Sequence, residues 1–129
     1  MPWWAIRTIH SGKDVIRINL FVNNLDDMLH FYQVILRQQA QIKRKDFCCF
    51  TLVRYPEFDI QFSLKALSKL SPKPTPGDDF LLEFFHTGYS SLINLLPECV
   101  TPVSKKCWKI RDPEGNIILL HEKSVVIIN

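Results

Sequence analysis

The sequence has little glycine and no glycine-rich loop. Only four of its 129 residues are glycine, and none lies near another. Nucleotide-binding loops place several glycines close together so that the backbone can approach a phosphate. The sequence therefore excludes that class of site. It also contains no motif that places a nucleophile beside a base, so a covalent catalytic mechanism is not indicated.

Cysteine is equally scarce, and its spacing carries no metal or redox signature. The four cysteines are Cys48, Cys49, Cys99 and Cys107. None forms a C-x-x-C pair, and no zinc-finger spacing is present. Cys48 and Cys49 are adjacent, so in a strand they point to opposite faces and cannot share one partner. We predict reduced thiols that pack as small hydrophobic side chains.

Long apolar runs are absent too. None approaches the roughly 20 residues that span a bilayer, and Arg7, His10 and Lys13 interrupt the early apolar residues, unlike a signal peptide. We expect an intracellular protein, cytoplasmic or nuclear, without a membrane partner. The net charge of +3 is mild, and the basic residues form two small groups, which does not favour nucleic acid as a partner.

What the sequence does contain is the periodicity of a globular domain, with 47% apolar and 22% charged residues. The first part predicts short strands over 5–10 and 15–22. Asn23 and Asn24 then cap a helix that runs from Leu25 to about Gln39, with an apolar stripe facing the strand. Three further strands are expected over 40–43, 47–53 and 58–64. His30 falls off the helix stripe and is expected on the surface.

The same order of elements then recurs after a proline-rich linker at residues 68–79. A strand over 80–86 leads into a short helix that Thr87 or Ser90 caps and Pro97 ends. Strands follow over 101–104, 107–110 and 116–121, the last two joined by a turn built on Pro113 and Gly115. We predict one α+β domain, 1–129, of two βαβββ units, about 15–66 and 80–122. The N-terminal tryptophan pair suggests a domain cut from a longer protein.

Three motifs connect this order of elements to a known superfamily. They are Asn-Leu-Asp-Asp at 24–27, Phe-Tyr at 31–32 and Asp-Pro-Glu-Gly-Asn at 112–116. Together they resemble the vicinal oxygen chelate superfamily, the glyoxalase and bleomycin-resistance fold, over about 15–122. This implies two units that form a cupped mixed sheet. Residues 4–7, 46–48, 61–65 and 94–97 more closely resemble an animal family of longer, functionally uncharacterised proteins with a numbered "family with sequence similarity" label.

The superfamily resemblance also implies where a divalent metal would be held. Carried over one at a time, the ligand positions fall on Arg17, Gln61, Leu81 and Leu119. Hard metals need oxygen or imidazole ligands, which a guanidinium and two aliphatic side chains cannot supply. We therefore predict that the metal site is lost and that the domain needs no cofactor.

By strand alternation, the candidate ligand-binding residues that face the cup are Arg17, Asn19, Gln61, Glu83 and His121, with Asp59 and Ser63 as further candidates. A sheltered guanidinium needs a partner. Arg17 therefore either binds a carboxylate or phosphate that Gln61 and Asn19 orient, or pairs with Glu83 or Asp59. His121 either forms an acid–base pair with Glu83 or Asp59, or is an ordinary histidine at a strand end.

These observations favour a non-catalytic, metal-free interaction domain, a pseudoenzyme that binds a protein partner or forms a homodimer. The alternative is a metal-independent enzyme or small-anion sensor centred on Arg17. An ordinary metalloenzyme stays open only if a partner chain supplies ligands. Fold alone does not decide among them, because this architecture hosts lyases, dioxygenases and drug-sequestering proteins.

Overall fold

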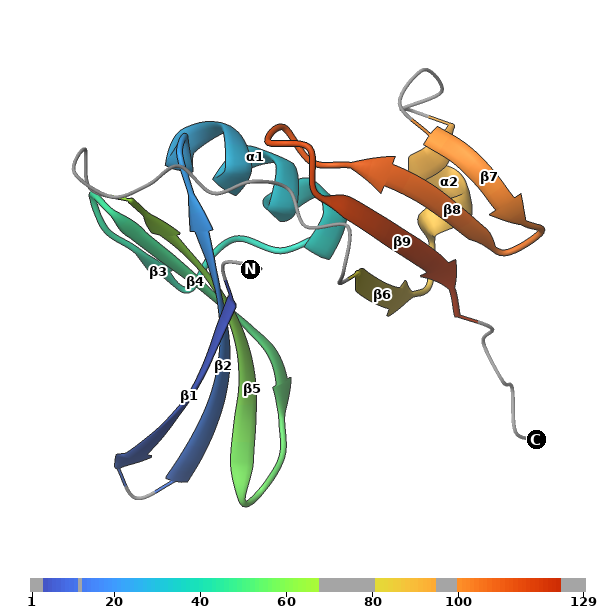
Figure 1. Cartoon of the computed structure of the whole chain (residues 1–129). Coiled ribbons are helices and arrows are strands. Elements are labelled where there is room, and N and C mark those ends of the chain that lie inside the picture. Colours follow the sequence, from blue (N-terminus) through green and yellow to red (C-terminus); the bar gives the residue numbers. More distant parts are fainter. Residues whose placement is uncertain (1–3, 12, 68–80, 95–99, 124–129) are drawn as a thin grey trace. The chain divides into compact units, whose positions relative to one another are not determined.

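A computed structural model describes residues 4–11, 13–67, 81–94 and 100–123, with side chains from residue 13 onward. The chain divides into two compact units, 1–75 and 76–129. Each unit contains one mixed sheet and one helix (Figure 1). The predicted α+β fold with two βαβββ units is confirmed. No helix in the described ranges is long and apolar enough to cross a bilayer.

Unit 1 carries a five-stranded sheet with one helix. Its elements are β1 (Trp4–Ser11), β2 (Lys13–Val22), α1 (Leu25–Leu36), β3 (Ile42–Lys43), β4 (Phe47–Arg54) and β5 (Phe58–Ala66). The strand order is β1-β2-β5-β4-β3. Only β2 and β5 run parallel, and β1 is an additional strand that lies antiparallel along β2 (Figure 1).

Helix α1 begins as the sequence predicts and ends earlier. The side chain of Asn24 accepts a hydrogen bond from the backbone N–H of Asp27 at 3.1 Å, a standard N-cap. The prediction that the helix reaches Gln39 is wrong. Arg37 adopts a left-handed conformation with φ of 57°, and the N–H of Gln38 turns back to the carbonyl of Gln33. That conformation ends the helix at Leu36.

The core of unit 1 lies between α1 and one face of the sheet. The alternation in β2 buries Leu20 and Val22, and the alternation in β5 buries Phe62 and Leu64, of which Leu64 is the register partner of Leu20. The helix stripe that covers them includes Tyr32, whose ring lies 5.0 Å from that of Phe62, centroid to centroid. The opposite face of the sheet therefore carries the polar residues of β2 and β5. His30 is exposed, as predicted.

The described residues of unit 2 repeat this topology and include no counterpart of β1. Its elements are β6 (Leu82–His86), α2 (Tyr89–Ile93), β7 (Val100–Ser104), β8 (Cys107–Arg111) and β9 (Ile117–Glu122). The strand order is β6-β9-β8-β7, and β6 runs parallel to β9 as β2 does to β5. The predicted helix end at Pro97, the predicted strand start at Phe80 and the linker at 68–79 lie outside the described residues.

The β8–β9 hairpin forms as predicted, and a buried carboxylate organises it. Asp112 is only 4% exposed. Its Oδ1 accepts hydrogen bonds from the N–H groups of Glu114 and Asn116, and its Oδ2 accepts one from Asn116 Nδ2 at 2.8 Å. Gly115, at a φ of 90°, closes the turn in a conformation that glycine adopts without strain. The hairpin places β9 beside β6 and so positions His121.

The start of α2 differs from the prediction, because neither Thr87 nor Ser90 is its N-cap. The cap residue is Gly88, with φ of 95° and no side chain to accept a bond. The carboxylate of Glu122 on β9 accepts instead from the N–H groups of Gly88 at 3.1 Å and Tyr89 at 2.8 Å. A carboxylate also interacts favourably with a helix N-terminus. Glu122, which is distant in sequence, therefore accepts the hydrogen bonds that an N-cap side chain usually accepts.

These contacts set the charge state of Glu122. Burial alone would raise its pKa. Hydrogen bonds from the N–H groups of Gly88, Tyr89 and Ser90 and from the Ser90 hydroxyl outweigh that effect and hold the pKa of Glu122 below its ordinary value of 4.5. Since the folded-state pKa is depressed, the stabilisation is present above the unfolded value and is lost as the pH falls through the folded-state value.

We predict that Glu122→Gln lowers the free energy of unfolding at neutral pH by about 1 kcal/mol, the usual effect of losing a helix cap. Urea denaturation followed by circular dichroism measures the change. The gap between wild type and variant should shrink as the pH falls from 4.5, the ordinary value, through the lower folded-state pKa of Glu122, because protonation of Glu122 removes the charge that distinguishes it from glutamine.

Glu57→Gln is the matched control, because Glu57 is an exposed carboxylate in a turn of unit 1. It should change stability far less than Glu122→Gln at every pH. An equal loss in both variants, or a gap for Glu122→Gln that does not depend on pH, would contradict the assigned role of Glu122.

Candidate functional site

The polar centre of unit 1 is a hydrogen bond between two neighbouring strands. Arg17 on β2 and Gln61 on β5 are register partners, and Arg17 Nε donates to Gln61 Oε1 at 3.0 Å. Both side chains are half-buried. Register partners in adjacent strands direct their side chains to the same face, so the two meet without any distortion of the sheet. Gln61 Nε2 in turn reaches Thr51 Oγ1 on β4 at 3.5 Å.

The guanidinium of Arg17 is held in place but not neutralised. Its Cζ lies 5.3 Å from the centroid of the Phe47 ring, within the range of a cation–π contact. The thiol of Cys49 also donates to Gln61 Oε1, at 3.4 Å, so that amide oxygen accepts from two side chains. Among the described residues of unit 1, Arg17 contacts no carboxylate. The backbone register places Arg7 opposite Arg17 across β1 and β2.

The neighbouring polar side chains on this face contact each other or a lysine. The Ser63 hydroxyl donates to Asn19 Oδ1 across the same two strands, and Ser63 is fully buried. Asp59 pairs with Lys13, whose Nζ lies 2.7 Å from Asp59 Oδ1. The predicted pairing of Arg17 with Asp59 is therefore wrong, whereas its pairing with Glu83, which belongs to the other unit, stays a prediction. The register gives Arg17 a neutral amide as its neighbour, and Lys13 occupies Asp59.

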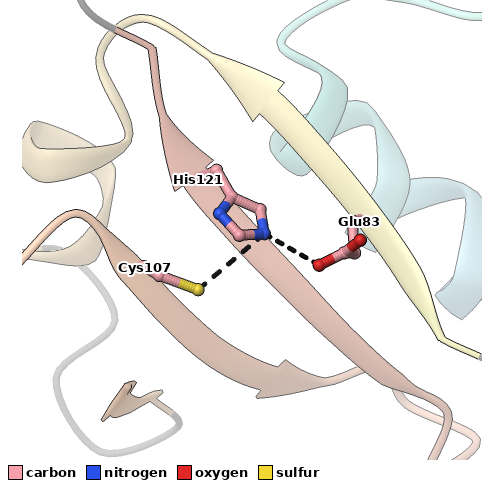
Figure 2. A network of polar contacts seen from close by, with 3 residues as sticks. All are labelled: Glu83, Cys107 and His121. Carbon is pink, nitrogen blue, oxygen red and sulfur yellow. Dashed lines mark hydrogen bonds and ion pairs between the residues drawn. The ribbon is translucent and has the colours of Figure 1, made fainter. Parts of the chain in front are cut away.

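Unit 2 carries a second polar cluster, on β6, β8 and β9. Glu83 Oε1 lies 3.0 Å from His121 Nε2, and the same ring nitrogen lies 3.9 Å from Cys107 Sγ. Figure 2 shows the imidazole between the thiol and the carboxylate, with both contacts reaching one nitrogen. Of the two predicted partners for His121, the structure therefore gives Glu83.

This arrangement is not that of a catalytic triad. In a triad the acid holds one ring nitrogen and the nucleophile faces the other, so that the free nitrogen can accept the nucleophile's proton. Here Nε2 serves both neighbours. When that nitrogen donates a proton to Glu83, it has no lone pair left for the thiol of Cys107. The cluster therefore orients His121 but does not activate Cys107.

Phe85 completes the cluster, and the sequence did not indicate its role. Its ring stacks on the imidazole of His121, with centroids 4.3 Å apart and planes at 10°. Phe85 is nevertheless 63% exposed. The available signal was its spacing of two from Glu83, which puts both on one face of β6.

The five predicted site residues thus form two clusters, each within its own unit. Arg17 bonds Gln61, with Asn19 in the next register row of the same sheet, and Glu83 bonds His121 in the other unit. The divalent metal that the superfamily resemblance implies does not fit these residues. The guanidinium of Arg17 donates a hydrogen bond to the amide oxygen of Gln61. The side chain of Leu119 is aliphatic and has no atom that can bind a metal. Within the described ranges, no three His, Cys, Asp or Glu side chains are placed to hold a metal.

Comparison with known proteins gives the family. The model of the FAM124 domain matches residues 1–121. The chain belongs to the FAM124 family. It is 42% identical over 123 residues to protein FAM124A of Xenopus laevis and 40% identical over 126 residues to human FAM124A, covering 94% and 96% of the chain. It is 32% identical over 122 residues to human FAM124B, covering 93% of the chain.

The chain spans about a quarter of the length of these curated FAM124 relatives, 24%, 23% and 27% respectively. Solved structures support the fold. A glyoxalase/bleomycin resistance protein from Albidiferax ferrireducens matches with a TM-score of 0.57 at 16% identity, covering 83% of this chain and 97% of that one. The fosfomycin resistance protein FosX from Mesorhizobium loti matches with a TM-score of 0.56 at 13% identity, covering 91% and 95%. The FAM124 domain therefore has a glyoxalase-like fold.

The described cysteines of this domain are free and buried, as predicted: Cys48, Cys49 and Cys107. Cys99 lies outside the described residues. Burial raises the pKa of Cys48 and of Cys49, and for Cys49 the neighbouring Arg17 only partly offsets this. Only the thiolate reacts with alkylating agents, so each unit of increase in pKa slows the reaction about tenfold.

We predict that iodoacetamide labels Cys48 and Cys49 far more slowly in the native protein than in urea, as measured for each peptide by mass spectrometry. Native labelling of either residue as fast as in urea would contradict the burial described here.

Proposed function

We propose that this FAM124 domain is a metal-free, non-catalytic binding domain that uses a glyoxalase-like fold as a scaffold for a protein partner or a second copy of itself. The observation that carries the proposal is the bond from Arg17 Nε to Gln61 Oε1. These residues stand at positions to which the superfamily resemblance assigns two metal ligands.

Electrostatics supports the loss of the metal. Two unit charges 4 Å apart interact by about 4 kcal/mol at an effective dielectric constant of 20, so a divalent ion beside a guanidinium meets about 8 kcal/mol of repulsion. Arginine stays protonated at all ordinary pH values, so deprotonation cannot relieve this repulsion. The amide oxygen of Gln61 is already an acceptor for Arg17 and Cys49.

The cluster of unit 2 supports the absence of catalysis. His121 is the histidine that strand alternation placed among the candidate ligand-binding residues, and its Nε2 faces both Glu83 and Cys107. A general base needs a lone pair directed at the proton that it removes. In the described arrangement, Glu83 fixes the imidazole by that same nitrogen. The cluster is thus suited to holding a surface residue in place.

We predict that the purified protein shows no stoichiometric binding of Zn²⁺, Mn²⁺ or Ni²⁺ by isothermal titration calorimetry. The double variant Arg17→His/Gln61→Glu puts an imidazole and a carboxylate on neighbouring strands and removes the cation. It should therefore bind Zn²⁺ at least about tenfold more tightly than wild type. Stoichiometric, chelator-sensitive binding by wild type would overturn the metal-free assignment.

A second candidate function is a small-anion sensor, or a metal-independent enzyme acting on such an anion, centred on Arg17. The observation in its favour is that this half-buried guanidinium is oriented by Gln61 and Phe47 but contacts no carboxylate among the described residues of its own unit. A guanidinium binds a carboxylate or phosphate through two parallel N–H bonds. Asn19 lies in the next register row, where its amide can orient a ligand.

For this candidate, succinate or inorganic phosphate should raise the melting temperature of the wild type. A ligand at one hundred times its Kd adds about 2.7 kcal/mol to the free energy of unfolding. Arg17→Leu should abolish the shift, and Arg17→Lys should reduce it because lysine lacks the fork. An equal shift in wild type and Arg17→Leu would remove this candidate.

A further inference from the structure

The polar row of unit 1 that contains Arg17 and Gln61 has a third member, Thr51 on β4. Thr51 is the register partner of Gln61 across the antiparallel strands β4 and β5, so the two side chains lie on one face of the sheet. Gln61 Nε2 donates to Thr51 Oγ1 at 3.5 Å, while Gln61 Oε1 accepts from Arg17 Nε at 3.0 Å. The amide of Gln61 therefore connects the hydroxyl of Thr51 to the guanidinium of Arg17.

The strand β4 is irregular directly after this row. Its pairing with β5 shifts between Thr51 and Val53, which leaves Leu52 as an additional residue on β4. Such a bulge interrupts the ladder of backbone hydrogen bonds, and bulges often lie beside functional sites, where they redirect a side chain. The row of Arg17 and Gln61 is therefore the last regular row before the bulge, and the backbone of Thr51 needs support from other groups.

Two glutamine side chains supply that support next to the start of β3. The N–H of Thr51 donates to Gln41 Oε1 at 2.7 Å, and the carbonyl of Thr51 accepts from Gln38 Nε2 at 3.4 Å. Gln41 Nε2 donates to Gln38 Oε1 at 3.2 Å, which joins the two amides to each other. Since β3 contains only two residues, these side chains provide the acceptor and the donor that a longer strand would present to Thr51.

The position of these glutamines is set by the left-handed turn that ends α1. Arg37, with a φ of 57°, turns the chain there, and Gln38 is the next residue. The N–H of Gln38 donates to the carbonyl of Gln33 in the helix, which fixes the turn. The end of α1 therefore determines where the amide of Gln38 meets Thr51. A continuous series of hydrogen bonds then leads from this turn to Arg17, and all of it lies within unit 1.

We propose that Thr51 is a positioning residue for the pair formed by Arg17 and Gln61. The side-chain amides of Gln38 and Gln41 in turn position Thr51. The hydroxyl of Thr51 holds Gln61 by Nε2, which directs Oε1 of the same amide at Arg17 Nε. The turn at the end of α1 thereby controls the orientation of the guanidinium. This role rests on the proposed function, because it acts on the pair that carries that function.

The test compares Thr51→Val with Thr51→Ser by the exchange rate of the Arg17 Nε–H proton, measured by NMR on the whole chain. Valine has the shape of threonine without the hydroxyl, whereas serine keeps the hydroxyl. We expect Thr51→Val to speed this exchange about fivefold, the usual effect of losing one neutral hydrogen bond. Thr51→Ser should retain the wild-type rate. The backbone N–H groups of β5, an interior strand, should exchange as in wild type, which separates this effect from a general loss of stability.

A second pair of variants tests the glutamines. Gln41→Leu removes the acceptor of the Thr51 N–H, so it should speed the exchange of the Arg17 Nε–H as Thr51→Val does. Gln39→Leu is the matched control, because Gln39 lies in the same turn and its Oε1 accepts from Gln33 Nε2 at 2.7 Å, not from Thr51. This control should leave the exchange rate unchanged.

Two results would overturn the proposal alone. One is a protected Arg17 Nε–H in wild type that Thr51→Val leaves equally protected. The other is equally fast exchange in Thr51→Val and Thr51→Ser, because the hydroxyl would then not be the group that acts. A wild type whose Nε–H is not protected at all would overturn the bond between Arg17 and Gln61, and with it both this proposal and the proposed function. The two failures are therefore distinguishable.

Discussion

The hydrogen bond between Arg17 and Gln61 across the parallel strands β2 and β5 is the constraint on which the account of this domain depends. It places a permanent cation at the centre of the polar face of the sheet and engages the amide oxygen that stands beside it. A cation and a divalent metal cannot share such a place at an acceptable free energy. The sheet keeps a glyoxalase-like topology, and this face of it carries a cation beside a neutral amide.

The two units show how one topology supports different surfaces. In unit 1 an additional strand pairs with β2, and asparagine caps the helix locally. In unit 2 the described residues include no strand at the corresponding place, and Glu122 from the last strand holds the helix start. That carboxylate links β9 to α2, while the neighbouring His121 stacks on Phe85 of β6. The start of α2 and the position of the Phe85 ring thus depend on adjacent residues of one strand.

Local patterns in the sequence were sufficient for the elements and their order. Alternation predicted β2 and β5, and the Asn24 cap and the hairpin turn at Gly115 formed as expected. The early end of α1 depends on the left-handed conformation of Arg37, which its residue type does not indicate, and the other errors depend on contacts between distant residues. No local signal shows that Glu122 caps α2 or that the strand register gives Arg17 an amide instead of a carboxylate. The same holds for Phe85, whose support comes from His121 on another strand.

The most direct test of the central claim is the side-chain NMR spectrum of Arg17. The account predicts a slowly exchanging Nε–H signal, because this proton is bonded to Gln61 Oε1, and this protection should disappear in Gln61→Leu. Adding equimolar Mn²⁺, a paramagnetic ion, should leave the signal unbroadened. An Nε–H that exchanges as fast as an exposed arginine, together with selective broadening of Arg17 and Gln61 by Mn²⁺, would contradict it.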